Sequence, residues 1–520
     1  MSDLFTTHLP ALIIAIPLFA AFLTPLISRI NGKGRNFVVI VALLMTFILT
    51  IKLAWHVYTD GTFLYAFGSS DASGFALHTP AGYVVPIRIL FEIDAMSALM
   101  GIITSSLALL GAIYSWNFVE KYETQDKYYT LLLLMTVGMF GMVFTGDLFN
   151  MFVFLEVLSI SGAALVAFRT EKGASIEAGL KYMIISSLGA MFMLFAVCLL
   201  YGQYDLLNLA ALAKRMDYTL LDEIALVALI GAFAMKSGAA PMHMWVPDAY
   251  GEAPASISLM LVASTQASLY ALFRVVFTLY GAHIDPTTIG WLFIIFGLLS
   301  IMVGVSMALM QDNLKRLIGY TAVAEIGYMM LAVGVAIASM GSGYSLMALK
   351  AGIFHILNDA LDIGLLFLVA GVLFYRTGAR NLAQLGGLAR NMKYTTFFFM
   401  IGLAAVAGLP PTNGFASKLL IYESIYLFNP VLAIIAILAS IFMLAIFVKV
   451  FHSAFLGPEL PSLAKVKEAP PSMLIPMAIL ALVMIIIGLF PNLVYSTIVC
   501  EAAKALLDQG GYIAAMIGGA

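Results

Sequence analysis

Four polar side chains interrupt one apolar stretch of the sequence, "GIFHILNDALDIGLLFL" at residues 352–368. His355, Asp359 and Asp362 are spaced by four and three residues, so a helix would place them on one face. A proton could pass along this row, or the two carboxylates, with Asn358 nearby, could hold a partly dehydrated Na+, because oxygen ligands suit a hard cation. A third interpretation is that the acids bind a basic residue or a neighbouring subunit and that this chain has lost ion conduction.

Ionisable residues recur within other apolar segments of the chain. A charge at bilayer depth costs at least about 2.5 kcal/mol, so each one is a candidate for ion transport with a partner to be found. Static ion pairs between helices are the alternative, but buried pairs stabilise weakly, so several such residues together favour transport. The candidates are Glu156, Lys181, Lys236, His243, Glu325, Lys350, His355, Asp359, Asp362 and Lys418.

Two lysines and two glutamates are expected to form acid–base pairs. Glu156 is the natural partner of Lys236, because burial and proximity act oppositely on such a pair and let it exchange a proton at modest cost. Lys418 is expected to play the same part with Glu325. His243 follows a proline, and it could relay a proton or cap a broken helix.

Composition places these residues in an integral membrane protein. The 520 residues are 62% hydrophobic and only 10% charged, whereas a soluble domain carries roughly a quarter charged residues. A net charge of -2 offers no basic surface for nucleic acid, and Cys198 and Cys500 lie too far apart in sequence to suggest a disulfide or metal motif. Because no phosphate-binding loop, CxxC pair or nucleotide fingerprint occurs, we expect no cofactor on this chain and any redox or ATP-driven step on another subunit.

Apolar runs of about 20 residues, the length that crosses a membrane, predict an all-α polytopic membrane protein with about 14 transmembrane helices. Spans 7 and 12 contain proline breaks beside Lys236 and Lys418. Matched breaks of this kind indicate inverted repeats around an ion path. The predicted organisation is helices 1–3 in residues 1–115 with an extramembrane loop at 59–92, a first five-helix repeat (helices 4–8) in 116–282, a second (helices 9–13) in 283–457, and helix 14 with a tail in 458–520.

Lysine and arginine are concentrated in the connections that follow the odd-numbered spans, for example at residues 29–35, 315–316 and 376–393. Positive charge marks the cytoplasmic side of a membrane protein. We therefore expect a multi-pass protein of the cytoplasmic (inner) membrane with both termini outside.

Four stretches carry a resemblance to a known family: "NMFVFLEVLSISGAALVAF", "KSGAAPMHMWVPDAYGEAPASIS", "DNLKRLIGYTAVAEIGYM" and "GLPPTNGFASK". They resemble the antiporter-like subunits of Mrp-type Na+/H+ antiporters, membrane-bound hydrogenases and respiratory complex I, from about residue 90 to 460. The Ser-Lys at 417–418 is most similar to the Mrp D-type subunit. The resemblance implies two inverted five-helix repeats, Glu156 and Lys236 in the first half-channel, Lys418 as a terminal proton-exchange residue and His355 as a relay between the halves.

The chain departs from this family in the centre of the expected ion path. Gln266 stands where relatives usually carry a lysine. In the eleventh span, Asp359 replaces a histidine, Asp362 a phenylalanine and Ile363 a lysine. Acids have thus replaced bases along this row.

The resulting prediction is an ion-translocating (H+ and/or Na+) subunit of a multi-subunit complex, either an Mrp-type antiporter or a related membrane-bound hydrogenase or respiratory complex. The partners would be further antiporter-like and small membrane subunits, with Fe–S or hydrogenase-type peripheral subunits in the redox-driven case. The alternative is a non-conducting scaffold that docks other antiporter-like subunits.

Overall fold

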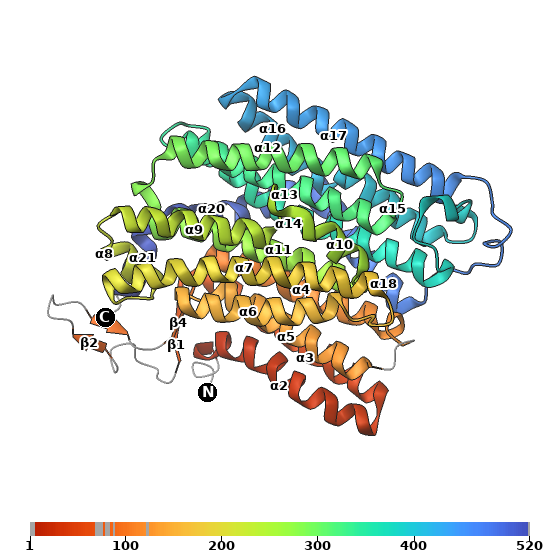
Figure 1. The fold of residues 1–520 in the computed structure, drawn as a ribbon, viewed down its shortest axis with the longest axis horizontal. Helices are drawn as coiled ribbons and strands as arrows, with labels where there is room; N and C mark the ends of the chain where they lie inside the picture. The colour runs from red at the N-terminus through yellow and green to blue at the C-terminus, as the bar shows by residue number, and fades with distance from the viewer. Residues whose placement is uncertain (1–5, 68–75, 79–83, 87–88, 121–123, 518–520) are drawn as a thin grey trace.

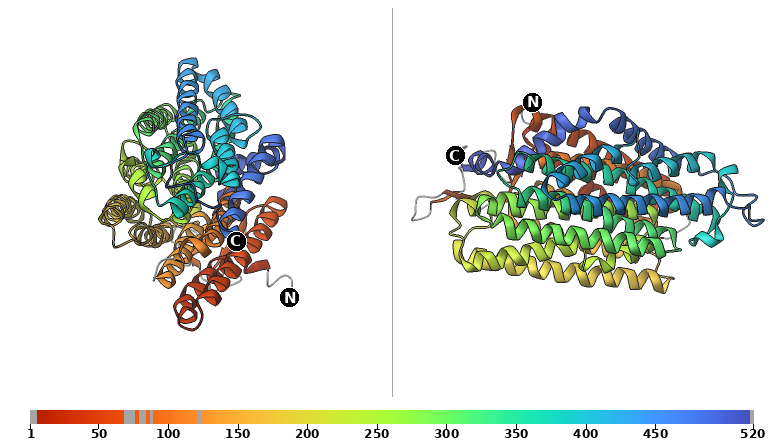
Figure 2. Two further views of the ribbon diagram at one scale, coloured as in Figure 1. Left: turned by 90° about the vertical axis from the view of Figure 1, so that its right-hand side faces the viewer. Right: turned by 90° about the horizontal axis from the view of Figure 1, so that it is seen from above.

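Long helices packed side by side make up nearly all of the computed structural model, which describes residues 6–67, 76–78, 84–86, 89–120 and 124–517 (Figure 1). Figure 2 gives the same bundle from one end and from above. Within these ranges thirteen helical segments are long and apolar enough to cross a membrane. Two shorter helices in series, α15 (Lys393–Val406) and α16 (Asn413–Phe428), occupy the region of the predicted twelfth span. The predicted all-α polytopic membrane protein is confirmed.

Most of the bundle is built from uninterrupted helices. These are α2 (Leu9–Ile30), α3 (Gly32–Asp60), α4 (Ala95–Phe118), α5 (Gln125–Phe144), α6 (Leu148–Val166), α7 (Gly173–Tyr204), α11 (Ala255–Arg274), α12 (Pro286–Met310), α13 (Leu314–Ala338), α14 (Ser345–Thr377), α17 (Pro430–Phe451) and α18 (Pro471–Leu489). Shorter α-helices are α8 (Leu209–Arg215), α9 (Leu220–Ser237), α10 (Trp245–Glu252), α15 (Lys393–Val406), α16 (Asn413–Phe428), α19 (Pro491–Val494), α20 (Cys500–Leu507) and α21 (Gln509–Ile517). Single 3-10 or π turns are η2 (Met242–Met244), η3 (Val275–Tyr280), η4 (Gly281–His283), η5 (Leu382–Gln384), η6 (Leu388–Arg390), η7 (His452–Leu456) and η8 (Tyr495–Val499).

The two ends of the bundle differ. Both termini lie at one end, here called the termini end, together with four short strands (Figure 1). Antiparallel pairs join β1 (Phe63–Ala66) to β4 (Leu90–Ile93) and β2 (Ala76–His78) to β3 (Val84–Pro86). These strands are the described part of the predicted loop at 59–92, of which residues 68–75, 79–83 and 87–88 lie outside the described residues. The connections after α14 and α17 lie at the opposite end, here called the basic end.

Two helices are interrupted inside the bundle. Helix α9 ends at Ser237 and α10 begins at Trp245, and α15 ends at Val406 before α16 begins at Asn413. At each break a glycine takes the left-handed conformation, with φ of 79° at Gly238 and 71° at Gly408, which only glycine adopts without steric cost. The first break leaves a lysine at the end of α9 and the second leaves one near the start of α16. That the two halves are inverted repeats stays a prediction.

Helices α12 and α13 approach so closely that their backbones touch. Gly290, Gly297 and Gly304 recur every seven residues along α12. A Cβ at Gly297 would lie 2.7 Å from the Leu331 nitrogen and 2.8 Å from the Gly327 carbonyl oxygen. Small residues permit this packing, which replaces the hydrophobic effect as a driving force between membrane helices. Helix α13 is therefore held firmly against its neighbour.

We predict that Gly297→Ala destabilises the protein, because the added methyl group has no room between the two backbones. Overpacking of this kind typically costs about 1–3 kcal/mol. The melting temperature of the detergent-purified protein should fall. The matched control is Gly202→Ala on α7, where a Cβ meets nothing within 4 Å. Equal melting temperatures for the two variants would contradict close packing as the reason for this glycine.

Candidate functional site

The carboxylate of Glu325 on α13 joins two other buried ionisable groups. Its Oε1 accepts a hydrogen bond of 2.8 Å from Lys418 Nζ on α16, and its Oε2 lies 2.7 Å from His355 Nε2 on α14. All three side chains are at most 1% exposed. The other imidazole nitrogen, Nδ1, lies 3.0 Å from the hydroxyl of Ser417. Three helices thus meet at one carboxylate in the middle of the bundle.

The break between α15 and α16 supplies a further contact to Lys418. Its Nζ donates a 2.6 Å hydrogen bond to the carbonyl of Val406, the last residue of α15. A carbonyl at a helix C-terminus has no partner within the helix and favours a nearby cation. The Tyr328 ring also lies 4.6 Å from this ammonium group. The helix break therefore helps to hold a positive charge inside the protein.

The two aspartates of α14 lie on the same arc of the helix as His355, but they face other partners. Asp359 accepts a 2.7 Å hydrogen bond from Gln266 Nε2 on α11. Asp362 accepts one of 2.6 Å from the backbone amide of Ile363. Both side chains are at most 2% exposed, and Asp359 Oδ1 and Asp362 Oδ2 have no hydrogen-bond partner among the described residues.

Amide oxygens add to the acceptors around this row. Asn358 on α14 and Asn413 on α16 each donate to the other's backbone carbonyl, at 3.0 and 3.3 Å. Their side-chain oxygens, and that of Gln266, are buried without a partner in the described part of the chain. No group of three or more His, Cys, Asp or Glu residues that could hold a metal occurs within the described ranges. A Na+ site at Asp359 and Asp362, which stays a prediction, would need these amide oxygens as additional ligands.

Lys236 is buried at the end of α9, and its ammonium group donates a hydrogen bond to the hydroxyl of Ser159 on α6. Glu156, one turn earlier on α6, acts electrostatically on Lys236. Among the described residues, however, no carboxylate oxygen lies within 4 Å of Lys236 Nζ. The Glu156–Lys236 pair is therefore open in this structure, whereas the Glu325–Lys418 pair is closed.

Three of the predicted residues lie outside the central cluster. Lys181 has a side chain that is 46% exposed, and it pairs with Glu177 at 2.7 Å and Asp248 at 2.8 Å. Lys350 is partly exposed near the start of α14, and His243 is partly exposed in η2 at the first helix break. The structure thus brings Glu325, His355, Asp359, Asp362 and Lys418 together, places Glu156 and Lys236 near each other, and leaves Lys181, Lys350 and His243 apart.

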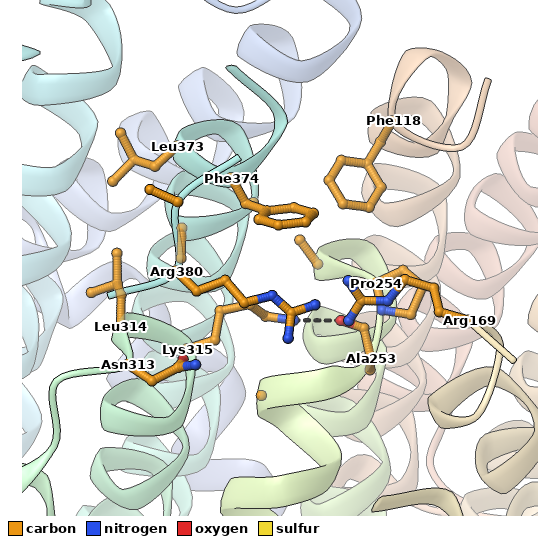
Figure 3. Close-up of a pocket in the computed structure, with 15 residues that line it drawn as sticks. Phe118, Arg169, Ala253, Pro254, Asn313, Leu314, Lys315, Leu373, Phe374 and Arg380 are labelled. Atoms are coloured by element: carbon orange, nitrogen blue, oxygen red, sulfur yellow. Dashed lines mark hydrogen bonds between the residues drawn. The ribbon is translucent and has the colours of Figure 1, made fainter. Parts of the chain in front are cut away.

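A cluster of cations at the basic end was not predicted from the sequence. Arg380 and Arg169 lie 2.7 and 3.4 Å from Oε2 of Glu252. Figure 3 shows the two arginine side chains extending toward each other from opposite sides of the cavity. Lys315 donates to the Ala253 carbonyl at the end of α10. The space between them is a cavity of about 20 Å³, room for a single water molecule.

This cluster clamps the end of α10 and leaves an excess of positive charge. Cations are favourable near a helix C-terminus. Lys172 adds another cation, 5.6 Å from the Phe374 ring. Burial, followed by the nearby Arg380 and Arg169, lowers the pKa of Lys172. The excess charge disfavours the approach of cations at this point. In the sequence, Glu252 is marked only by its place in "KSGAAPMHMWVPDAYGEAPASIS", one of the four stretches that carry the family resemblance.

Neutral polar residues of the site were also missed. Ser159, Asn413 and Ser417 are all buried. Ser159 accepts a hydrogen bond from Lys236, Ser417 is hydrogen-bonded to His355, and the backbone carbonyl of Asn413 accepts one from Asn358. Serine and asparagine are common near helix breaks and carry no charge. Only the tertiary structure distinguishes these residues from the rest.

We predict that Glu325→Gln strongly destabilises the protein. Removal of one partner of a buried ion pair leaves an uncompensated charge and costs about 3–5 kcal/mol. The melting temperature of the purified protein should fall well below that of Asp359→Asn, an equally conservative change that breaks no ion pair within 4 Å among the described residues. The double variant Glu325→Gln/Lys418→Met should recover most of the loss. A Glu325→Gln protein as stable as Asp359→Asn would contradict this account.

Comparison with known proteins identifies relatives of this chain both by sequence and by fold. The family model described as "NADH:quinone oxidoreductase/Mrp antiporter, TM" matches residues 145–443. The chain is 30% identical to NADH-quinone oxidoreductase subunit N of Desulforudis audaxviator, over 95% of this chain and 98% of that protein. It is 29% identical to the D-type subunit of the Na(+)/H(+) antiporter of Bacillus subtilis, over 84% and 87%. These identities do not separate the two types of subunit.

Two solved structures share the whole fold. A chain of the Mrp complex from Dietzia sp. DQ12-45-1b superimposes with a TM-score of 0.87 at 24% identity, covering 99% of this chain and all of that one. A chain of the membrane-bound sulfane sulfur reductase, an archaeal respiratory membrane complex, superimposes with a TM-score of 0.84 at 27% identity, covering 98% and 100%. The chain belongs to the family of antiporter-like membrane subunits shared by Mrp antiporters and NADH:quinone oxidoreductases.

Proposed function

We propose that this subunit moves H+ and/or Na+ across the membrane as part of a multi-subunit complex. The observation that carries the proposal is the buried row of ionisable groups in the middle of the bundle, which comprises Asp362, Asp359, His355, Glu325 and Lys418. Charged groups at this depth are costly and mark ion pathways. Two carboxylate oxygens of this row lack a hydrogen-bond partner in the described part of the chain, so they are available to a proton or a cation.

The two lysines at the helix breaks are the switching elements of the proposed path. Lys236 bonds to Ser159, with Glu156 one turn away, so rotation of its side chain exchanges a neutral partner for an acidic one. Lys418 already contacts Glu325. The His355–Asp359–Asp362 row begins at the Lys418 site, where His355 contacts Glu325, and it is the proposed link from there to the Lys236 site. If the ion is Na+, the same aspartates are its proposed ligands.

A non-conducting scaffold is the second candidate. It is supported by Gln266, which carries no charge at the position where the family resemblance leads us to expect a lysine, and by the closed Glu325–Lys418 pair, which is also what a static lock between α13 and α16 would need.

The setting of the subunit belongs to the same proposal. Other membrane subunits are fitting partners, because both structural neighbours are chains of larger complexes. Fe–S or hydrogenase-type peripheral subunits would accompany a redox-driven complex. The chain would carry no cofactor, bind no nucleic acid, and lie in the cytoplasmic membrane with the termini end outside, as the positive charge at the basic end supports.

We predict that Asp359→Asn/Asp362→Asn stops ion movement without dispersing the complex. Asparagine keeps the size of each side chain but can neither release a proton nor offer a charged ligand. Ion movement should be measured in vesicles that contain the whole complex, with a pH-sensitive dye for H+ and 22Na+ uptake for Na+. Lys236→Ala should have the same effect.

The matched control is Asp248→Asn, which changes an acid of the Lys181 cluster outside the row. If the double Asn variant transports normally in an intact complex, the conduit function is wrong. If it loses partner subunits during purification and the control does not, the scaffold function is correct.

A further inference from the structure

The cavity at the basic end has cations in its wall and no acid among its described lining residues. Arg169, Lys315 and Arg380 line it. Glu252, beside the cavity, is the carboxylate that the two arginines share. Lys315 has no carboxylate oxygen within 4 Å of its Nζ among the described residues, and it donates instead to the backbone carbonyl of Ala253. The dipole of a carbonyl does not cancel a full charge.

Three cations also gather around a single aromatic ring at this cavity. The centre of the Phe374 ring lies 5.1 Å from Arg380, 5.6 Å from Lys172 and 5.7 Å from Arg169. An aromatic face attracts cations through its quadrupole, but it carries no net charge. The ring therefore holds the cations close together without removing the repulsion between them.

Two further acids near the cavity are engaged outside it. Glu171 is exposed and acts on Lys172, and Asp248 bonds to Lys181 and Arg316. Neither acid lines the cavity. Arginine does not lose its proton in proteins. Compensation inside the cavity therefore requires either a negatively charged ligand or the loss of a proton from a lysine.

The cavity wall also has hydrogen-bond donors that the described residues do not use. The Lys315 ammonium group has three N–H donors, and its one described acceptor is the Ala253 carbonyl. Arg380 has five N–H donors, and its one described acceptor is Oε2 of Glu252. Both side chains can therefore donate to a ligand that lies between them.

Two helices begin at the cavity and add to its positive potential. Helix α11 begins at Ala255 and α13 at Leu314, and both residues line the cavity. A helix N-terminus carries a partial positive charge and N–H groups without partners in the helix, so it favours anions. The opposing C-terminus of α10 is already capped, because Arg169 and Lys315 donate to its last carbonyls.

The size of the cavity selects a small ligand. Its volume is about 20 Å³, and the rings of Phe118 and Phe374 line it on one side of the two arginines (Figure 3). A space of this volume admits one water molecule or a monatomic ion of similar size, whereas a phosphate group with four oxygens is too large. Water would fill the space but would bring no negative charge.

We propose that this cavity is a chloride site, in which one Cl− accepts hydrogen bonds from Lys315 and Arg380. The ion compensates the cations around Phe374 and joins the end of α10 to the beginnings of α11 and α13. The chloride is a fixed structural ligand and takes no part in ion movement along the central row. The site therefore does not depend on the proposed function.

The test is the binding of 36Cl− to the purified complex, for the wild type and for Lys315→Met, which keeps the apolar stem and removes the ammonium group. Loss of a hydrogen bond to a charged ligand should raise the Kd of one chloride per complex at least about tenfold. The matched control is Arg316→Met, because Arg316 is the next residue, pairs with Asp248 at 3.1 Å and does not line the cavity. The control should bind 36Cl− as the wild type does.

A second measurement is the melting temperature of the same complexes, with sodium gluconate replaced stepwise by sodium chloride at constant ionic strength. A ligand that binds the folded state raises the melting temperature. The rise should saturate with chloride in the wild type and in Arg316→Met, and it should shift to higher chloride concentration in Lys315→Met. If Lys315→Met does not assemble, Lys172→Gln replaces it. This exposed change removes a neighbouring charge and should raise the Kd about threefold.

An assembled Lys315→Met complex that binds 36Cl− as tightly as the wild type overturns the chloride site, and so does an unchanged Kd in Lys172→Gln when Lys315→Met does not assemble. A wild-type complex that binds no 36Cl− also overturns it. The cavity then holds water, and a lysine has lost its proton.

Discussion

Compensation of buried charge by Glu325 is the interaction on which the centre of the bundle depends. One carboxylate meets an ammonium group at 2.8 Å and an imidazole at 2.7 Å, and all three groups are removed from solvent. Without that carboxylate, the Lys418 ammonium group would be an uncompensated charge in a low-dielectric interior, and its free energy there would be far higher than in water. The packing of α13, α14 and α16 around this point follows from the need to keep the three groups in contact.

The helix break at α15–α16 contributes to the same compensation. An uninterrupted helix would use the carbonyl of Val406 internally, whereas the break leaves it free to accept from Lys418. The break at α9–α10 leaves Lys236 beside a serine hydroxyl instead of a carboxylate. The two lysines therefore have different surroundings, although both lie next to proline-containing interruptions, and this difference gives the two halves of the molecule distinct electrostatic states.

The fold and part of the site followed from sequence because membrane insertion imposes simple rules. Apolar length located the spans, and the cost of charge in hydrocarbon selected Glu325, His355 and Lys418, which the structure brings together. The same rule also selected Lys181, which is half-exposed and paired at the surface. Sequence position within an apolar segment does not reveal which side of a helix faces the protein.

What the sequence could not supply are contacts between neutral groups and between distant segments. The mutual hydrogen bonds of Asn358 and Asn413 depend on how α14 and α16 cross. The clamp around Glu252 joins two connections, which carry Arg169 and Arg380, to the start of α13, which carries Lys315. Such contacts have no periodicity or motif, because each partner alone is an ordinary polar residue.

The glycine-lined contact between α12 and α13 has a mechanical consequence. With backbone atoms of the two helices in van der Waals contact at Gly297 and Gly327, neither helix can slide or rotate past the other without a collision. Glu325 is carried by this rigid pair and so keeps a fixed position in the membrane. In the proposed function, charge moves by the reorientation of lysine side chains and by proton hops between stationary groups, and large rocking motions of the α12–α13 pair are not required.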